Sequence, residues 1–75
     1  MSTVQSIDRA FAVLRALTRG DAGVTEIAER VALPKSTVSR LLSTLEELGA
    51  VEQIEAGGGS RIGPGLAEIA AAARP

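Results

Sequence analysis

The sequence contains no cysteine and no histidine. It therefore has no disulfide, no thiolate nucleophile and no imidazole base, and most transition-metal sites would lack their usual ligands. The acidic residues do not form a recognisable convergent pair either. An enzyme is thus the least favoured class, and we expect neither a metal nor another cofactor.

Aromatic residues are almost missing. Phe11 is the only one, although 45% of the residues are hydrophobic, so the core must be built from Leu, Ile, Val and Ala. A chain of 75 residues supports one small core. These two features favour a single domain of short packed helices.

Long apolar runs are absent as well. None approaches the roughly 18 residues that a membrane-spanning helix needs. The N-terminal sequence MSTVQSIDRA lacks the basic start and apolar middle of a signal peptide. We therefore expect a cytoplasmic protein without a membrane partner.

Charge of one sign is not in excess, because the net charge is −1. The charges are nevertheless distributed unevenly along the chain. Residues 30–45 contain three cations and no acid, namely Arg30, Lys35 and Arg40, whereas residues 46–56 contain four acids and no base, namely Glu46, Glu47, Glu52 and Glu55. A nearly neutral total thus conceals a local basic surface.

Two helices are predicted before residue 34. In the first, apolar residues recur at steps of three and four until Gly20, and they are Val4, Ile7, Phe11, Leu14 and Leu17. The second is short, with Thr25 as its N-cap and with Ile27, Ala28 and Val31 facing inward.

A third helix is predicted from Lys35 to Leu48. Pro34 disfavours helical geometry at Leu33 and is suited to the start of a new helix, so it fixes the turn. One side of this helix is apolar, with Val38, Leu41, Leu42, Leu45 and Leu48. The opposite side carries Ser36, Ser39, Arg40, Ser43 and Glu47.

The last third of the chain predicts a hairpin and a final helix. Gly49 is suited to end the third helix in a left-handed conformation. Residues 51–54 and 60–62 are strand-like and flank a glycine-rich turn, and residues 66–73 favour a helix. In this order, the segments predict a mainly α fold with a small β-hairpin, a winged helix-turn-helix with a three-helix core, a two-stranded wing and a C-terminal linker helix. Residues 1–63 would form the domain, and residues 64–75 would start the linker helix.

The polar side of the third helix is typical of a helix that enters the major groove of double-stranded DNA. Ser36 and Ser39 can bind base edges or phosphates, and Arg40 can bind a guanine or clamp a phosphate. The remaining candidates are backbone contacts or lie at the edge of this face, and they are Thr25, Lys35, Thr37, Ser43 and Arg61. An ordinary solvated face, a simple N-cap at Thr25 and an exposed arginine at Arg61 are the open alternatives.

The run VTEIAERVALPKSTVSRLLSTLEELGAVE, followed by SRIGPGLAEIA, resembles the N-terminal DNA-binding domain of the IclR family of bacterial transcriptional regulators. The opening VQSIDRAFAVLRAL is similar to the first helix of that family, so the resemblance covers nearly the whole chain. It implies a repressor or activator that binds a pseudo-palindromic operator as a homodimer. It also implies dimer contacts through the first helix, with Arg9 exposed, and a missing C-terminal domain that binds a small-molecule effector.

Two positions depart from the family pattern. Ala32 stands where the family usually has glycine, so a left-handed backbone there would carry strain of roughly 1 kcal/mol. Ser60 stands where an aromatic residue is common, which leaves the packing of the wing open. The competing interpretation of the whole chain is a winged-helix module that binds another protein, and the overall acidity supports it.

Overall fold

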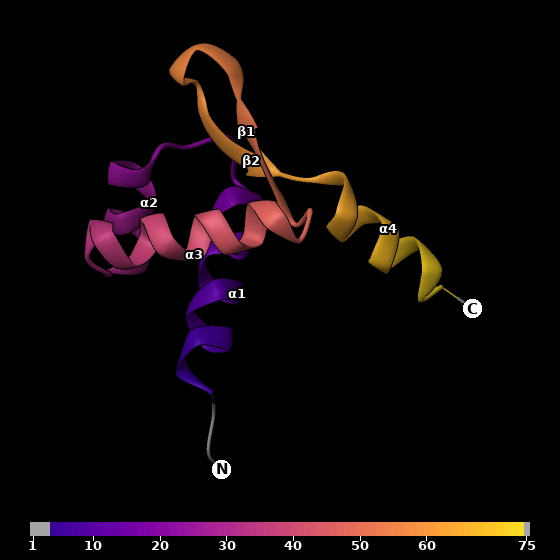
Figure 1. Cartoon of the computed structure of the whole chain (residues 1–75). Helices are drawn as coiled ribbons and strands as arrows, with labels where there is room; N and C mark the ends of the chain where they lie inside the picture. Colours follow the sequence, from indigo (N-terminus) through magenta and orange to yellow (C-terminus); the bar gives the residue numbers. More distant parts are fainter. Residues whose placement is uncertain (1–3, 75) are drawn as a thin grey trace.

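The computed structural model describes residues 4–74. In it α3 crosses α1, the hairpin projects from one side, and α4 extends away from the body (Figure 1). The elements are α1 (Gln5–Leu17), α2 (Val24–Val31), α3 (Lys35–Glu47), β1 (Val51–Ile54), a short 3-10 turn η1 (Glu55–Gly57), β2 (Gly59–Ile62) and α4 (Pro64–Ala72). The predicted fold class, mainly α with a two-stranded antiparallel hairpin, is confirmed.

The core is aliphatic and lies where the first three helices meet. Its buried hydrophobic residues come from α1, α2, α3, β1 and the loop before α2: Val13, Leu14, Leu17, Ala22, Ile27, Ala28, Val38, Leu42, Leu45 and Val51. Phe11, the single aromatic residue, is 49% exposed and does not belong to it. Small branched side chains therefore allow α1, α2 and α3 to pack closely.

The turn between α2 and α3 has the geometry that the sequence indicates. Ala32 adopts the left-handed conformation, with φ 57° and ψ 45°, and the Leu33 N–H donates to the Ala28 carbonyl at 3.1 Å. Pro34 is extended and immediately precedes α3. Because both conformations are locally fixed, the angle between the two helices is fixed as well.

Gly49 ends α3 as predicted, with φ 80°. Its N–H donates to the Glu46 carbonyl at 3.1 Å, and the Ala50 N–H donates to the Leu45 carbonyl at 2.9 Å. This pair of bonds is a Schellman motif, which satisfies two carbonyls at the end of the helix. The chain then reverses directly into β1.

The hairpin is tied to the loop between α1 and α2. β1 and β2 pair antiparallel, with Glu52 opposite Arg61 and Gln53 opposite Ser60. On the other side of β2, Ser60 and Ala22 exchange two backbone hydrogen bonds, at 2.8 and 3.1 Å. Ser60 is buried, so the wing is packed here around a small side chain, where the resemblance implies that an aromatic residue is common.

Two details of the predicted helices are wrong. Thr25 is not the N-cap of α2, because Gly23 is extended and occupies that position, and the Ile27 N–H donates to the Gly23 carbonyl at 3.0 Å. Leu48 is 72% exposed although it was placed on the apolar side of the third helix. It lies at the very end of that side, where the other described elements leave it uncovered.

Apolar residues also remain exposed at two other places. Val4, directly before α1, and Ile7 on α1 are 62% and 57% exposed, because this end of α1 extends beyond the core. α4 has no buried residue within Pro64–Ala72, and Leu66 packs partly against the core. The final helix therefore contacts the domain mainly at its first turn.

Within residues 4–74, no helix is long and apolar enough to cross a membrane. The same part of the chain has no group of three acidic, cysteine or histidine residues that could hold a metal ion.

Candidate nucleic-acid interface

The two sides of α3 differ in burial as well as in polarity. Val38, Leu42 and Leu45 are buried in the core, which holds the helix in one orientation. The polar side is open to solvent, and its exposed residues are Ser36, Ser39, Arg40, Ser43 and Glu47. A fixed helix that presents short hydroxyl side chains and a guanidinium is suited to a DNA groove.

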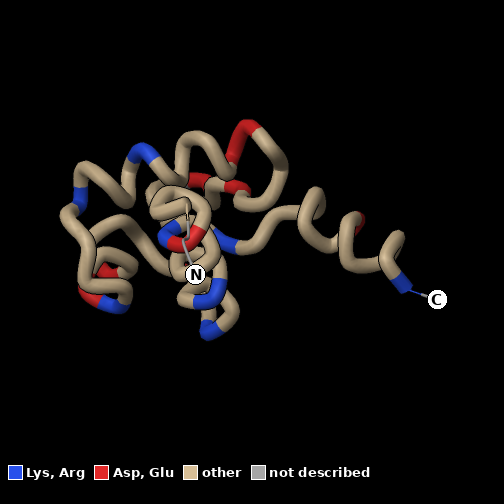
Figure 2. The backbone as a smooth tube through the Cα atoms, turned by 90° about the horizontal axis from the view of Figure 1, so that it is seen from below, with Lys and Arg blue, Asp and Glu red and all other residues tan. Residues whose placement is uncertain are grey.

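Charge divides α3 along its length. Lys35 and Arg40 lie in the N-terminal half, and Glu46 and Glu47 end the helix. In Figure 2 the blue segments accordingly lie at one end of α3 and the red segments at the other. An anionic duplex would therefore approach the N-terminal half of α3, which is also where such helices usually reach base edges.

The N-terminal ends of α2 and α3 belong to the same helix-turn-helix, and both can bind a phosphate group. Lys35 is the first residue of α3, and Thr25 is the second residue of α2. Both are exposed. Free N–H groups at a helix start favour an anion, and no side-chain capping bond is made at the start of either helix.

The wing places its candidate cation beside an acid. Arg61 is exposed on β2 and is paired in register with Glu52 on β1. Its Nε lies 3.5 Å from a carboxylate oxygen of Glu52, and both side chains are about half exposed. Such a pair is weak in water, so a phosphate could replace the carboxylate.

A further cation lies beside α3 that the sequence interpretation did not place there. Arg9 of α1 and Arg40 of α3 line one hollow of about 370 Å³, together with Gln5, Ser6, Thr37, Leu41 and Thr44. Gln5 and Arg9 are one turn apart and share one side of α1, opposite the side of Ile7 and Phe11. Arg9 therefore lies next to Arg40 at the edge of the α3 surface.

The comparisons with known proteins agree with this geometry. The sequence profile described as the IclR helix-turn-helix domain matches residues 6–55. The chain belongs to the IclR family. It is a helix-turn-helix DNA-binding domain of the IclR type and not an enzyme.

Relatives of the IclR-type domain are regulators. The chain is 41% identical over 68 residues to the HTH-type transcriptional regulator TtgV of Pseudomonas putida. This match covers 88% of this chain and 26% of that protein. It is 40% identical over 53 residues to the transcriptional repressor IclR of Escherichia coli, with 68% and 19% covered. The chain therefore spans about a quarter or less of these two curated relatives.

Solved structures of the family have the same fold as this IclR-type domain. An IclR transcriptional regulator from Alicyclobacillus acidocaldarius matches with a TM-score of 0.90 and 35% identity, over 96% of this chain and 30% of that one. A family member from Brucella abortus matches with a TM-score of 0.86, also at 35% identity, over 96% and 28%. The likeness includes the hairpin and the start of α4, because it extends over nearly the whole chain.

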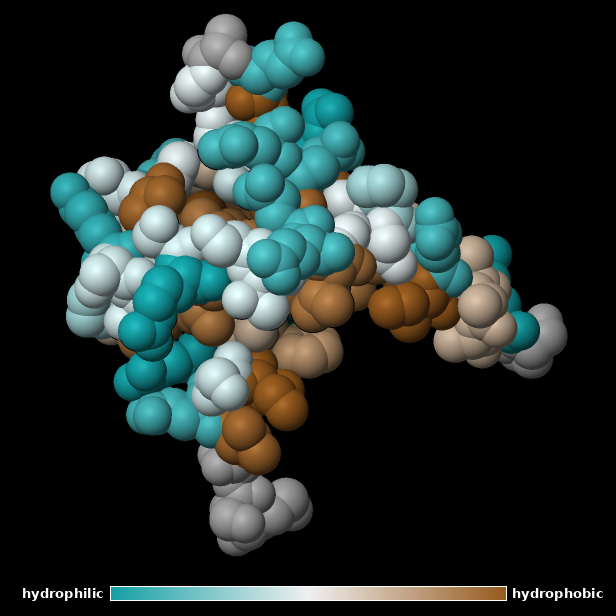
Figure 3. All heavy atoms as spheres, viewed as in Figure 1, coloured by the Kyte–Doolittle hydropathy of each residue, from teal (hydrophilic) through white to brown (hydrophobic). Residues whose placement is uncertain are grey.

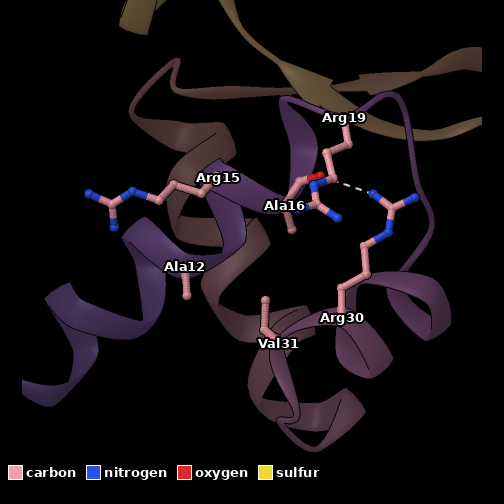
Figure 4. Close-up of a pocket in the computed structure, with 6 residues that line it drawn as sticks. All are labelled: Ala12, Arg15, Ala16, Arg19, Arg30 and Val31. Atoms are coloured by element: carbon pink, nitrogen blue, oxygen red, sulfur yellow. Dashed lines mark hydrogen bonds between the residues drawn. The ribbon is translucent and has the colours of Figure 1, made fainter.

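A second basic hollow of the IclR-type domain lies between α1 and α2, away from α3. It is lined by Ala12, Arg15, Ala16, Arg19, Arg30 and Val31. The Arg30 guanidinium donates to the Ala16 carbonyl at 2.9 Å and to a Glu26 carboxylate oxygen at 2.8 Å. Figure 4 shows the ends of Arg19 and Arg30 on the same side of the hollow, while Arg15 points away. Arg30 thus ties α2 to the last turn of α1, which is a structural role.

Proposed function

We propose that this IclR-type domain binds a pseudo-palindromic operator as a homodimer, with the N-terminal half of α3 in the major groove. The exposed polar side of α3, fixed from behind by Val38, Leu42 and Leu45, is the observation that carries the proposal. Ser36, Ser39 and Arg40 would contact base edges. The phosphate contacts would come from residues around them, namely Thr25, Lys35, Thr37, Ser43 and Arg61, together with Arg9.

The apolar residues left exposed on α1 support a dimer. Ile7 lines two neighbouring surface hollows, one of about 330 Å³ beside Val4 and Phe11 and one of about 400 Å³ beside Leu41 and Leu48. In Figure 3 apolar residues gather on the lower side of the body, from the N-terminal end of α1 toward α4. An exposed apolar patch of this kind is suited to a symmetric contact with a second copy.

The role of α4 follows from its position at the edge of the domain. Residues 1–63 would form the operator-binding unit, and residues 64–75 would begin a linker helix to a C-terminal domain that binds a small-molecule effector. Such a protein would act in the cytoplasm as a repressor or an activator. This proposal is supported by membership of the IclR family and by the greater length of the relatives, of which the chain spans about a quarter or less.

Selection from a random duplex library, followed by fluorescence anisotropy on the enriched duplex, would test operator binding. We expect Arg40→Gln to lower the affinity about tenfold or more and to reduce the salt dependence, because it removes a contact to a base or a phosphate. Arg19→Gln is the matched control, since it removes the same charge from the α1–α2 side. Equal affinities of the two variants would contradict the assignment of Arg40.

The second candidate function is a protein-binding module. The observation that favours it is the acidic end of α3, where Glu47 lies on the same exposed side as Ser36 and Ser39. Under this alternative no duplex would be enriched, and loss of Arg40 would leave the weak binding of any DNA unchanged. The same selection experiment therefore separates the two functions.

A further inference from the structure

The first turn of α4 is joined by its backbone to the residues that end α3. The Gly65 N–H donates to the Gly49 carbonyl at 2.8 Å. Directly before α4, the N-cap Gly63 continues the hairpin register one step beyond Val51 and Ile62, and its N–H donates to the Ala50 carbonyl at 2.8 Å. The N–H groups in the first turn of a helix have no partner within that helix. The end of α3 thus supplies a partner that α4 itself cannot provide.

Only glycine permits this approach. A Cβ atom on Gly65 would lie 2.7 Å from the Gly49 oxygen and 2.8 Å from the Gly49 carbonyl carbon. A Cβ atom on Gly63 would lie 2.6 Å from the same oxygen. Because these neighbours are backbone atoms, they cannot rotate away as a side chain would. The contact between the two helix ends therefore depends on Gly63 and Gly65.

Apart from these bonds, α4 lies against β1 but is not buried in the domain. It has no buried residue, and only Leu66 in its first turn packs partly against the core. Gly49, on the other side of the contact, belongs to the Schellman motif that ends α3. The joint is consequently fixed to the residues that end α3 and lead into β1 rather than to a loose loop.

We propose that Gly63 and Gly65 are positioning residues, which lock the direction of α4 to the C-terminal end of the DNA-reading helix. α3 and the start of α4 then move as one body. A force on α4 is transmitted to the placement of α3 in the groove, and by linkage DNA bound to α3 restrains α4. This inference rests on the proposed function in assigning DNA reading to α3.

The geometry can be measured by electron–electron distance spectroscopy. The chain has no cysteine, so Glu46→Cys on α3 and Ala70→Cys on α4 give two unique spin-label sites, both exposed. We expect a narrow distance distribution that stays the same when the selected duplex is added. A broad distribution, or one that shifts on binding, would overturn the proposal.

Gly65→Ala is the variant that breaks the joint. We expect it to shift or broaden the label distance and to weaken binding of the selected duplex about two- to thirtyfold. Gly23→Ala is the matched control, because nothing lies within 4 Å of its Cβ position and its φ is −89°. If Gly65→Ala behaves like this control in either distance or affinity, the positioning role is refuted.

Two further measurements distinguish failure of this proposal from misfolding of the variant and from failure of the proposed function. If Gly65→Ala does not fold, hydrogen exchange on the unaltered chain replaces it: a slowly exchanging Gly65 amide, protected as well as the Ala50 amide, supports the joint, and an unprotected one refutes it. If the unaltered chain binds no duplex, the proposed function fails. The label distance, which is measured without DNA, still decides whether α3 and α4 are locked.

Discussion

Ala32 and Gly49 hold the same left-handed backbone conformation at the ends of α2 and α3, with φ of 57° and 80°. Each is followed by an N–H that donates five residues back, from Leu33 to Ala28 and from Ala50 to Leu45. The two helix ends are built alike, but only one uses the residue for which this conformation is free of strain.

The strain at Ala32 predicts a stabilising substitution. Ala32→Gly should raise the free energy of unfolding by about 0.5 kcal/mol, since relief of the left-handed alanine exceeds the entropy that glycine loses on folding. Gly49→Ala should lower it by about 1 kcal/mol. Urea unfolding followed by circular dichroism measures both, with Ala12→Gly, in ordinary helix, as a control that should be destabilising. A less stable Ala32→Gly variant would contradict the prediction.

The pair Glu52 and Arg61 predicts opposite effects of two substitutions on the wing. Arg61→Gln should weaken binding of the selected duplex several-fold and reduce the slope of log K against log salt by about one. Glu52→Gln should strengthen binding, because it removes the carboxylate that competes with a phosphate for Arg61. Anisotropy titrations at several salt concentrations measure both slopes. If binding is unaffected by either change, the wing does not contact DNA.

Arg9 predicts a contact from α1. Arg9→Gln should weaken duplex binding and lower the salt slope by about one, because Arg9 shares a hollow with Arg40. The double variant with Arg40→Gln should lose less than the sum of the two losses if both guanidiniums hold one phosphate. An unchanged affinity together with a weaker dimer would instead support the family-based assignment of Arg9 to the dimer contact.

Arg30 predicts a loss of stability without a loss of DNA binding. Arg30→Met removes the hydrogen bond to the Ala16 carbonyl and the ion pair with Glu26. We expect about 1 kcal/mol less stability, as for a typical hydrogen bond. The affinity for the duplex should stay within about twofold of the original, because Arg30 lies away from the DNA-binding side of α3. Thermal unfolding and anisotropy measure the two quantities, and Arg19→Met, which removes a neighbouring charge, serves as the control.

The exposed position of Ile7 predicts a change in assembly. Ile7→Glu should shift the domain toward the monomer, because it places a charge between the two apolar hollows that would receive a second copy. The fold should survive, since Ile7 is 57% exposed. Sedimentation velocity measures the shift, and Gln5→Glu adds the same charge on another side of α1. A monomer in both the unaltered chain and the variant would remove this surface as the dimer contact.

Local chemistry accounts for the parts of the fold that could be predicted from the sequence. Pro34 and Gly49 restrict their own backbone, so the turn between α2 and α3 and the end of α3 were predicted from single residues. Thr25 misled the interpretation, because a good capping side chain does not reveal that Gly23 is extended and starts α2 earlier. Burial at the ends of elements depends on where helices cross, which sequence periodicity does not contain.

The candidate interface was predictable to a similar extent. The exposed side of α3 follows from helical periodicity around buried Val38 and Leu42, so its residues were found together. Arg9 was placed beside Arg40 only by the structure, because its position depends on the angle at which α1 crosses α3. The ion pair of Arg61 with Glu52 likewise depends on the register of the hairpin, which two short strands with a glycine turn did not specify.

The backbone bonds between Ala22 and Ser60 also bear on aggregation. A strand at the edge of a sheet exposes unpaired N–H and carbonyl groups that can recruit strands from other molecules. Here the loop before α2 occupies the outer edge of β2 at its buried residue, and each strand has only four residues. The wing therefore offers a poor template for strand addition, even where many copies of the domain are crowded together.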